Sequence, residues 1–164
     1  MDLPIQLPVF IMRITGIHGL LLAAVLASGC STSQQVRLAK MSPHPPVTSV
    51  AQVPQDGNST AMDRHLSDAL REEGLTVKAP LPAGTRSSSE VDAIVSYVDV
   101  WRWDLTMYMK SLSVQLHDAR TGDLLVTGDW SDSAMHGFRD AREVVRGVVA
   151  EMMATLRGVA ARRP

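Results

Sequence analysis

The stretch from Val91 to Trp130 constrains the fold of this 164-residue chain most strongly, because it is dense in β-branched and aromatic residues. Its composition divides it into three expected strands: Val91–Trp103, Leu105–Asp118 and Leu124–Trp130. Between the last two, the segment 118–123 (DARTGD) has the composition of a hairpin turn, and Gly122 is available for a positive φ. The sequence therefore predicts a three-strand antiparallel meander.

The second of these strands changes its apolar face partway along. Leu105, Met107 and Met109 share one parity, whereas Leu112, Val114 and Leu116 share the other. Because strand side chains alternate between faces, we expect a bulge or bend near Lys110 and Ser111.

Two segments that flank the meander repeat apolar residues at helical spacing. We expect the first helix to be capped by Ser59 or Thr60 and to end at Gly74, and the second to end at Gly158. Their apolar stripes are Met62, Leu66, Ala69 and Leu70 in the first, and Phe138, Ala141, Val145, Val148, Val149, Met152 and Leu156 in the second.

Shorter segments complete the expected fold. Val36–Lys40 and Leu75–Val77 are predicted strands, and Val47–Val53 is predicted to be extended. The pattern predicts an α+β domain over residues 36–158, with a single mostly antiparallel sheet of about four to five strands and two helices packed on one face. Residues 159–164 are expected to fray.

An apolar run, Ile14–Ser31, follows Arg13 near the N-terminus. It is shorter than the roughly 20 apolar residues of a membrane-spanning helix and has no basic cluster after it, so a cleaved signal is favoured over a permanent span. The run contains Cys30, the only cysteine of the chain. An ordinary secretory signal with an unrelated cysteine is the alternative.

Residues 26–30 (LASGC) resemble the lipobox of bacterial lipoproteins. The small residues Ser28 and Gly29 fit that motif, and Ala27 stands where leucine is usual. The resemblance implies that residues 1–29 are a lipoprotein signal peptide, that cleavage falls between Gly29 and Cys30, and that Cys30 carries diacylglycerol and palmitate.

The ends of this signal carry two further expectations. Residues 1–11 hold two prolines, an aspartate and no positive charge, so we expect translation to start at Met12 rather than at Met1. Residues 30–35 are expected to form a lipidated tether. Ser31 stands where an aspartate would retain such lipoproteins in the inner membrane, which implies the periplasmic face of the outer membrane.

Composition and motifs argue against several functions. A net charge of −1 gives no electrostatic footprint for nucleic acid. The histidines left after cleavage are not spaced as metal ligands, and no nucleophile or phosphate-loop motif is present, so we expect no enzyme, no metal and no cofactor beyond the lipid on Cys30. These histidines are His44, His65, His117 and His136.

The segment 99–108 (DVWRWDLTMY) is the most unusual stretch. In a strand, Trp101 and Trp103 share one face with Asp99, and Asp104 lies on the other, which argues against a glycosidase-type carboxylate pair. The tryptophans are interpreted either as core under the helices, which is favoured, or, with Tyr108, as a surface for a partner or ligand.

The run W-R-W-D-L-x-M-Y-M at 101–109, the turn at 118–122 and the following strand together resemble a group of small, uncharacterised bacterial outer-membrane lipoproteins. The resemblance spans about residues 91–156 and implies no catalytic residue. The element order is also similar to that of the curli secretion lipoprotein, the lipoprotein activators of penicillin-binding proteins and the N-terminal domain of TolB, as a fold analogy only.

These features lead to one functional expectation and one alternative. We expect an outer-membrane-anchored periplasmic lipoprotein that is a non-catalytic binding or accessory module for an envelope component, with a protein of the envelope as its partner. The alternative is a tethered periplasmic enzyme or small-ligand carrier that uses a pocket near Trp101, Trp103 and Tyr108.

Overall fold

A computed structural model of the chain describes residues 32–39, 46–133 and 138–160. The expected signal peptide, the cleavage site at Gly29 and Cys30, and the choice between Met1 and Met12 all lie outside these residues. So do His44, His136 and the last four residues of the expected tail.

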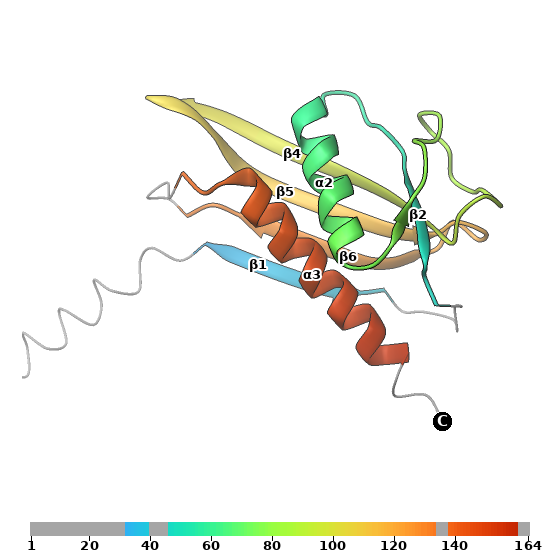
Figure 1. Ribbon diagram of the computed structural model, residues 1–164. Helices are drawn as coiled ribbons and strands as arrows, with labels where there is room; N and C mark the ends of the chain where they lie inside the picture. Colours follow the sequence, from blue (N-terminus) through green and yellow to red (C-terminus); the bar gives the residue numbers. More distant parts are fainter. Residues whose placement is uncertain (1–31, 40–45, 134–137, 161–164) are drawn as a thin grey trace, which may run out of the picture. The chain divides into compact units, whose positions relative to one another are not determined.

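The described residues form one six-stranded sheet and two helices (Figure 1). In chain order the strands are β1 (Ser33–Leu38), β2 (Ser49–Gln52), β3 (Thr76–Val77), β4 (Ala93–Asp104), β5 (Thr106–Asp118) and β6 (Leu124–Ser131). Their order across the sheet is β1-β6-β5-β4-β2-β3. The α+β class, the mostly antiparallel sheet and the meander are confirmed.

The sheet has six strands, not the predicted four to five. The difference arises at β2, which pairs in parallel with both β3 and β4. β2 and β3 are four and two residues long, too short for their side chains to show a period. The helix between them serves as the crossover that parallel neighbours need.

The β1 strand begins at Ser33, three residues before the expected Val36, and pairs with β6 along its whole length. Residues 33–35, which were expected to belong to the tether, are therefore part of the sheet. In the described part of the chain, only Thr32 precedes β1.

The first helix, α2 (Thr60–Glu72), has the predicted ends. The Ser59 hydroxyl accepts a hydrogen bond from the backbone N–H of Met62 at 3.2 Å. Gly74 adopts φ +83°, and its N–H donates to the carbonyl of Arg71 at 2.9 Å.

The second helix, α3 (Ala141–Ala160), differs from the prediction at both ends. It begins after Asp140, whose Oδ1 accepts hydrogen bonds from Arg142 N–H at 2.7 Å and Glu143 N–H at 3.2 Å. Phe138, predicted to be helical, lies before this cap with φ +41°. At the other end α3 continues past Gly158, because a glycine inside a helix weakens it without ending it.

Both helices cover the same face of the sheet, as predicted (Figure 1). The core between the layers joins apolar side chains of both helices to those of the central strands. Its fully buried members include Met62 and Leu66 from α2, Tyr97, Val95, Leu112, Val114, Leu116 and Val126 from the sheet, and Val145, Val148 and Val149 from α3.

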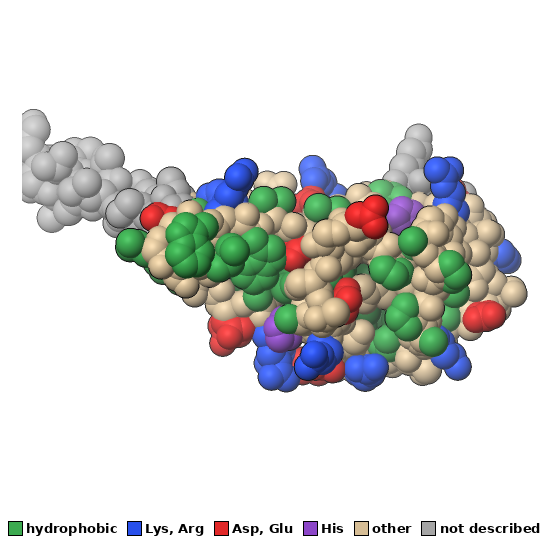
Figure 2. Space-filling model, turned by 90° about the horizontal axis from the view of Figure 1, so that it is seen from above, with side chains coloured by type: hydrophobic (Ala, Val, Ile, Leu, Met, Phe, Trp, Pro, Cys, Tyr) green, Lys and Arg blue, Asp and Glu red, His purple; other side chains and the backbone are tan. Residues whose placement is uncertain are grey.

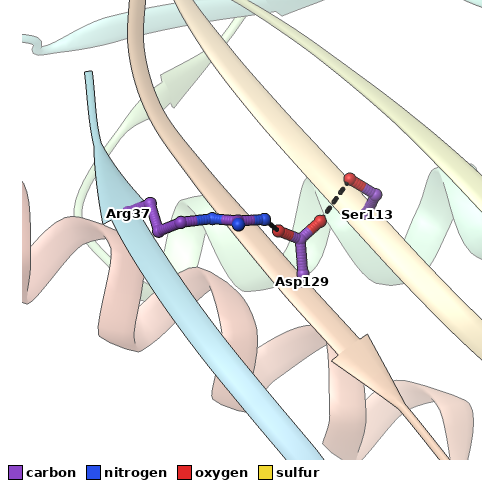
Figure 3. A network of polar contacts seen from close by, with 3 residues as sticks. All are labelled: Arg37, Ser113 and Asp129. Carbon is purple, nitrogen blue, oxygen red and sulfur yellow. Dashed lines mark hydrogen bonds and ion pairs between the residues drawn. The ribbon is translucent and has the colours of Figure 1, made fainter. Parts of the chain in front are cut away.

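The other face of the sheet is polar along β1, β6 and β5. The Asp129 carboxylate in β6 pairs with the guanidinium of Arg37 in β1 and accepts a hydrogen bond from the Ser113 hydroxyl in β5 at 2.7 Å (Figure 3). On the same face, nearer the start of β1, the hydroxyls of Ser33 and Ser131 are 2.7 Å apart. No helix within the described ranges is long and apolar enough to cross a membrane.

Candidate binding surface

The β4–β5 hairpin extends past the rest of the sheet. One row of backbone partners runs across it from Ser33 to Ser131, then to Ser111 and Val100. β1 begins at this row and β6 ends there. Among the described strands, only β4 and β5 continue beyond it, to a turn at Leu105 (Figure 1).

A β-bulge marks the base of this extension, at the predicted place. Val100 pairs with Ser111, but Trp101 pairs with Met109, so Lys110 is the extra residue. The Lys110 ammonium donates to the carbonyl of Asp132 at 3.1 Å, and the Lys110 carbonyl accepts from the Asp132 N–H at 2.9 Å. The bulge explains the change of apolar parity along β5, because it restores the helix-facing side to Met109.

The two tryptophans share the parity of Tyr97, which faces the helices, but they lie beyond the helices' reach. The Tyr97 hydroxyl donates to the Asp63 carboxylate in the first turn of α2, so helix cover of β4 ends near this point. Trp101 is 37% exposed and Trp103 is 73% exposed. The favoured interpretation of the tryptophans as core is therefore wrong, and they are surface residues.

Two further apolar side chains extend this surface. Leu105 at the turn is 92% exposed with φ +55°, and Met107, the partner of Trp103, is 56% exposed. We call residues 101–107 the hairpin tip. In Figure 2, hydrophobic side chains gather at the left end of the described part of the molecule. Leu105 and Met107 share a parity in the sequence. That parity does not show that the helices end before this part of the hairpin and leave its face exposed.

The third predicted residue of the surface, Tyr108, does not lie with the tryptophans. It is directly opposite Arg102, so alternation places it on the other face of the hairpin. Tyr108 is buried, and Phe138, just before α3, contacts its ring edge-on with centroids 5.9 Å apart. The three aromatic residues thus do not converge on one pocket.

The charges around the tip are balanced. Two acids and two bases lie between residues 99 and 110: Asp99, Arg102, Asp104 and Lys110. The Asp99 carboxylate accepts a hydrogen bond from the indole N–H of Trp101 at 2.5 Å, which orients that ring. Asp104 lies next to the turn, paired with Thr106. Asp99 and Asp104 are thus at different levels of the hairpin, rather than facing each other across a cleft.

A cavity of about 820 Å³ lies at the opposite end of β4. Its lining includes Ile94, Ser96, His117, Arg86 and Arg120. Burial lowers the pKa of His117, which favours its neutral form. His65 lies on α2, away from this lining. Within the described ranges no three histidine, cysteine or acidic side chains group as metal ligands.

Comparison with protein-family models and with curated protein sequences gives no match. Among solved structures, the PelC dodecamer from Paraburkholderia phytofirmans is similar at 14% identity and a TM-score of 0.49, with 77% of this chain and 97% of that chain covered. A leucine-to-methionine variant of the same dodecamer gives 11% identity, a TM-score of 0.48 and the same coverage. Similarity at this level carries no inference about function.

Proposed function

We propose that this chain is an outer-membrane-anchored periplasmic lipoprotein that acts as a non-catalytic binding module for an envelope component. The anchor is the lipid expected on Cys30, and the binding surface is the hairpin tip. The observation that carries the binding function is the exposure of Trp101, Trp103, Leu105 and Met107 on a hairpin that extends past the rest of the sheet.

Exposed apolar side chains of this size favour a binding role. Each Å² of apolar surface moved out of water contributes about 25 cal/mol, so a cluster of four such side chains holds a substantial gain for whatever covers it. Singly exposed apolar residues are common on proteins, but a contiguous group on a projecting element is typical of an interaction site. Tryptophan is also enriched where binding energy concentrates.

The start of the sheet supports the anchored arrangement. Because β1 begins at Ser33, only two residues, Ser31 and Thr32, separate Cys30 from the folded sheet. A lipid at Cys30 would hold the domain close to the membrane, and stable anchoring takes two lipid signals, which diacylglycerol and palmitate together supply.

The alternative of a tethered enzyme or small-ligand carrier has less support. It requires Trp101, Trp103 and Tyr108 to line one pocket. The tryptophans are exposed, whereas Tyr108 is buried on the other face of the hairpin.

A photo-crosslinking amino acid placed at Leu105 in living cells tests the binding function. Ala83, which is exposed in the loop at the other end of β4, is the matched control. We expect an adduct with an envelope component from position 105 and none from position 83. Equal labelling from both positions, or no adduct from either, would contradict the proposal.

A further inference from the structure

We propose that the hairpin tip docks into the headgroup region of the same membrane that holds Cys30, so that the protein is attached at two points. This inference rests on the proposed function, because it requires the lipid on Cys30. It names the envelope component that the tip contacts as the lipid surface itself.

The chain enters the sheet at the same end as the hairpin turn. β1 begins at Ser33, in the row that runs through Ser131 and Ser111 to Val100. The hairpin extends beyond this row by five residues, 101–105, or about 16 Å at 3.3 Å per residue. The start of β1 and the hairpin turn lie at the same end of the sheet (Figure 1).

The segment that joins Cys30 to β1 is short. Cys30 is three residues before Ser33, and a fully extended chain of three residues spans at most about 11 Å. A lipid on Cys30 therefore keeps the row at Ser33 within about 11 Å of the anchored residue. The hairpin reaches about 16 Å past that row, which is more than the tether can span. A hairpin that points toward the membrane therefore reaches the headgroups.

The side chains of the hairpin tip have the chemistry that suits a headgroup region. Tryptophan prefers the boundary between headgroups and acyl chains, where the ring is buried and the indole N–H stays near water. Leu105 at the turn supplies an aliphatic side chain at the leading position. Arg102 and Asp104 resist entry into the hydrocarbon, so the tip would stay at the interface.

An envelope protein is the alternative occupant of the hairpin tip, and it has less support. A short tether gives the tip a high effective concentration of headgroups at all times, without a search for a partner. The local charges of the tip sum to zero, so no acidic or basic patch on the tip selects a charged protein surface.

Two attachments would fix the orientation of the domain. A single short tether alone leaves the domain free to pivot, whereas a docked hairpin sets the direction of β4. The cavity with His117 and Arg120 lies near the first residues of β4, and the tip lies near its last. That cavity would then face away from the membrane, toward the periplasm.

The test uses the full lipoprotein, purified from membranes and reconstituted into phosphatidylethanolamine and phosphatidylglycerol vesicles. Because the Cys30 sulfur is blocked by the lipid, the variant Leu105→Cys has a single free thiol, which takes an environment-sensitive fluorophore. Ala83→Cys, labelled in the same way, is the matched control. Vesicles that contain lipids with a quencher near the headgroup then report contact.

We expect quenching at position 105 to exceed that at position 83 several-fold, with a blue shift of the emission only at 105. Equal quenching at both positions in a protein shown by mass to carry its lipid would overturn the inference alone. A Leu105 probe that crosslinks to a protein in cells but is not quenched in protein-free vesicles would also overturn it. A protein that carries no lipid would instead refute the proposed function.

Discussion

The Tyr97 hydroxyl donates a hydrogen bond to a carboxylate oxygen of Asp63, 2.8 Å away, and joins β4 to the first turn of α2. The same Asp63 oxygen accepts from the side-chain amide of Gln52 at 2.5 Å. This partly buried contact fixes where α2 starts along β4. It therefore also fixes which residues of the hairpin remain uncovered, Trp101 and Trp103 among them.

Replacing Tyr97 with phenylalanine is expected to lower the free energy of unfolding by about 1 to 2 kcal/mol, since the half-buried Asp63 carboxylate loses a hydrogen-bond donor. Burial and the neighbouring Asp63 carboxylate raise the pKa of Tyr97, so its hydroxyl stays protonated as a donor across the neutral range. A double-mutant cycle with Asp63→Asn, measured by urea unfolding, should give a coupling of about 1 kcal/mol. Additive effects would show that the two residues act separately.

Gly128 in β6 allows α3 to pack closely on the sheet. A Cβ added there would lie 2.6 Å from Val148 Cγ1 and 2.6 Å from the Met152 sulfur. Gly128→Ala is therefore expected to destabilise the fold by about 1 to 3 kcal/mol through overpacking.

Gly158→Ala is the matched control for that change, because a Cβ at Gly158 in α3 meets nothing within 4 Å. It should stabilise the fold by up to about 1 kcal/mol through helix propensity. Thermal unfolding of both variants is the measurement. A Gly128 variant as stable as the wild type would show that α3 packs less closely than described.

The lowered pKa of Asp92 predicts that the fold loses stability in acid. One of its carboxylate oxygens accepts hydrogen bonds from Thr48 and Ser49, including both hydroxyls, and these bonds lower its pKa from 3.8 to about 2. Because the pKa is lower in the folded state than in the unfolded state, this contribution to stability is present above about pH 4 and is lost as the pH falls toward 2.

The variant Asp92→Asn should therefore have a lower melting temperature at pH 6 and a shallower decline between pH 4 and 2. Asp123→Asn, on the turn before β6, is the control. If the Asp92 variant shows the same pH profile as the wild type, the hydrogen bonds at Asp92 contribute nothing to folding.

The loss of stability on replacing a tryptophan should depend on where the tryptophan lies. Trp103→Ala is expected to change the free energy of unfolding by less than about 0.5 kcal/mol, because the side chain is mostly in water. Trp130→Ala, at a side chain that is 6% exposed, should cost about 3 to 5 kcal/mol. Urea unfolding of the two variants measures both. A large loss of stability from Trp103→Ala would show that this side chain is buried rather than exposed.

Local signals in the sequence were sufficient for much of the fold. The cap at Ser59, the positive φ of Gly74 and Gly122 and the bulge at Lys110 all follow from neighbours in sequence, because caps, turns and strand parity are local. The meander follows for the same reason. The predicted place of Phe138 in the second helix is wrong, because Phe138 continues the apolar stripe by spacing alone, while Asp140 provides the cap of α3.

The exposed hairpin tip is harder to predict from the sequence than the fold. Strand alternation alone places Trp101 and Trp103 on one face, but alternation does not say how far the helices extend over β4. That limit depends on long-range contacts such as the one between Tyr97 and Asp63. The pairing of β1 with β6, which brings the chain entry to the base of the hairpin, has no local signal either.

The most direct test of the account is the intact mass of the mature protein from the membrane fraction, with palmitate labelling, for the wild type and for Cys30→Ala. We predict a chain that begins at Cys30 and carries diacylglycerol and palmitate, and we expect both the label and the membrane association to be lost in the variant. An unlabelled, soluble wild-type product cleaved at another position would contradict the anchor, and with it the membrane-docked hairpin.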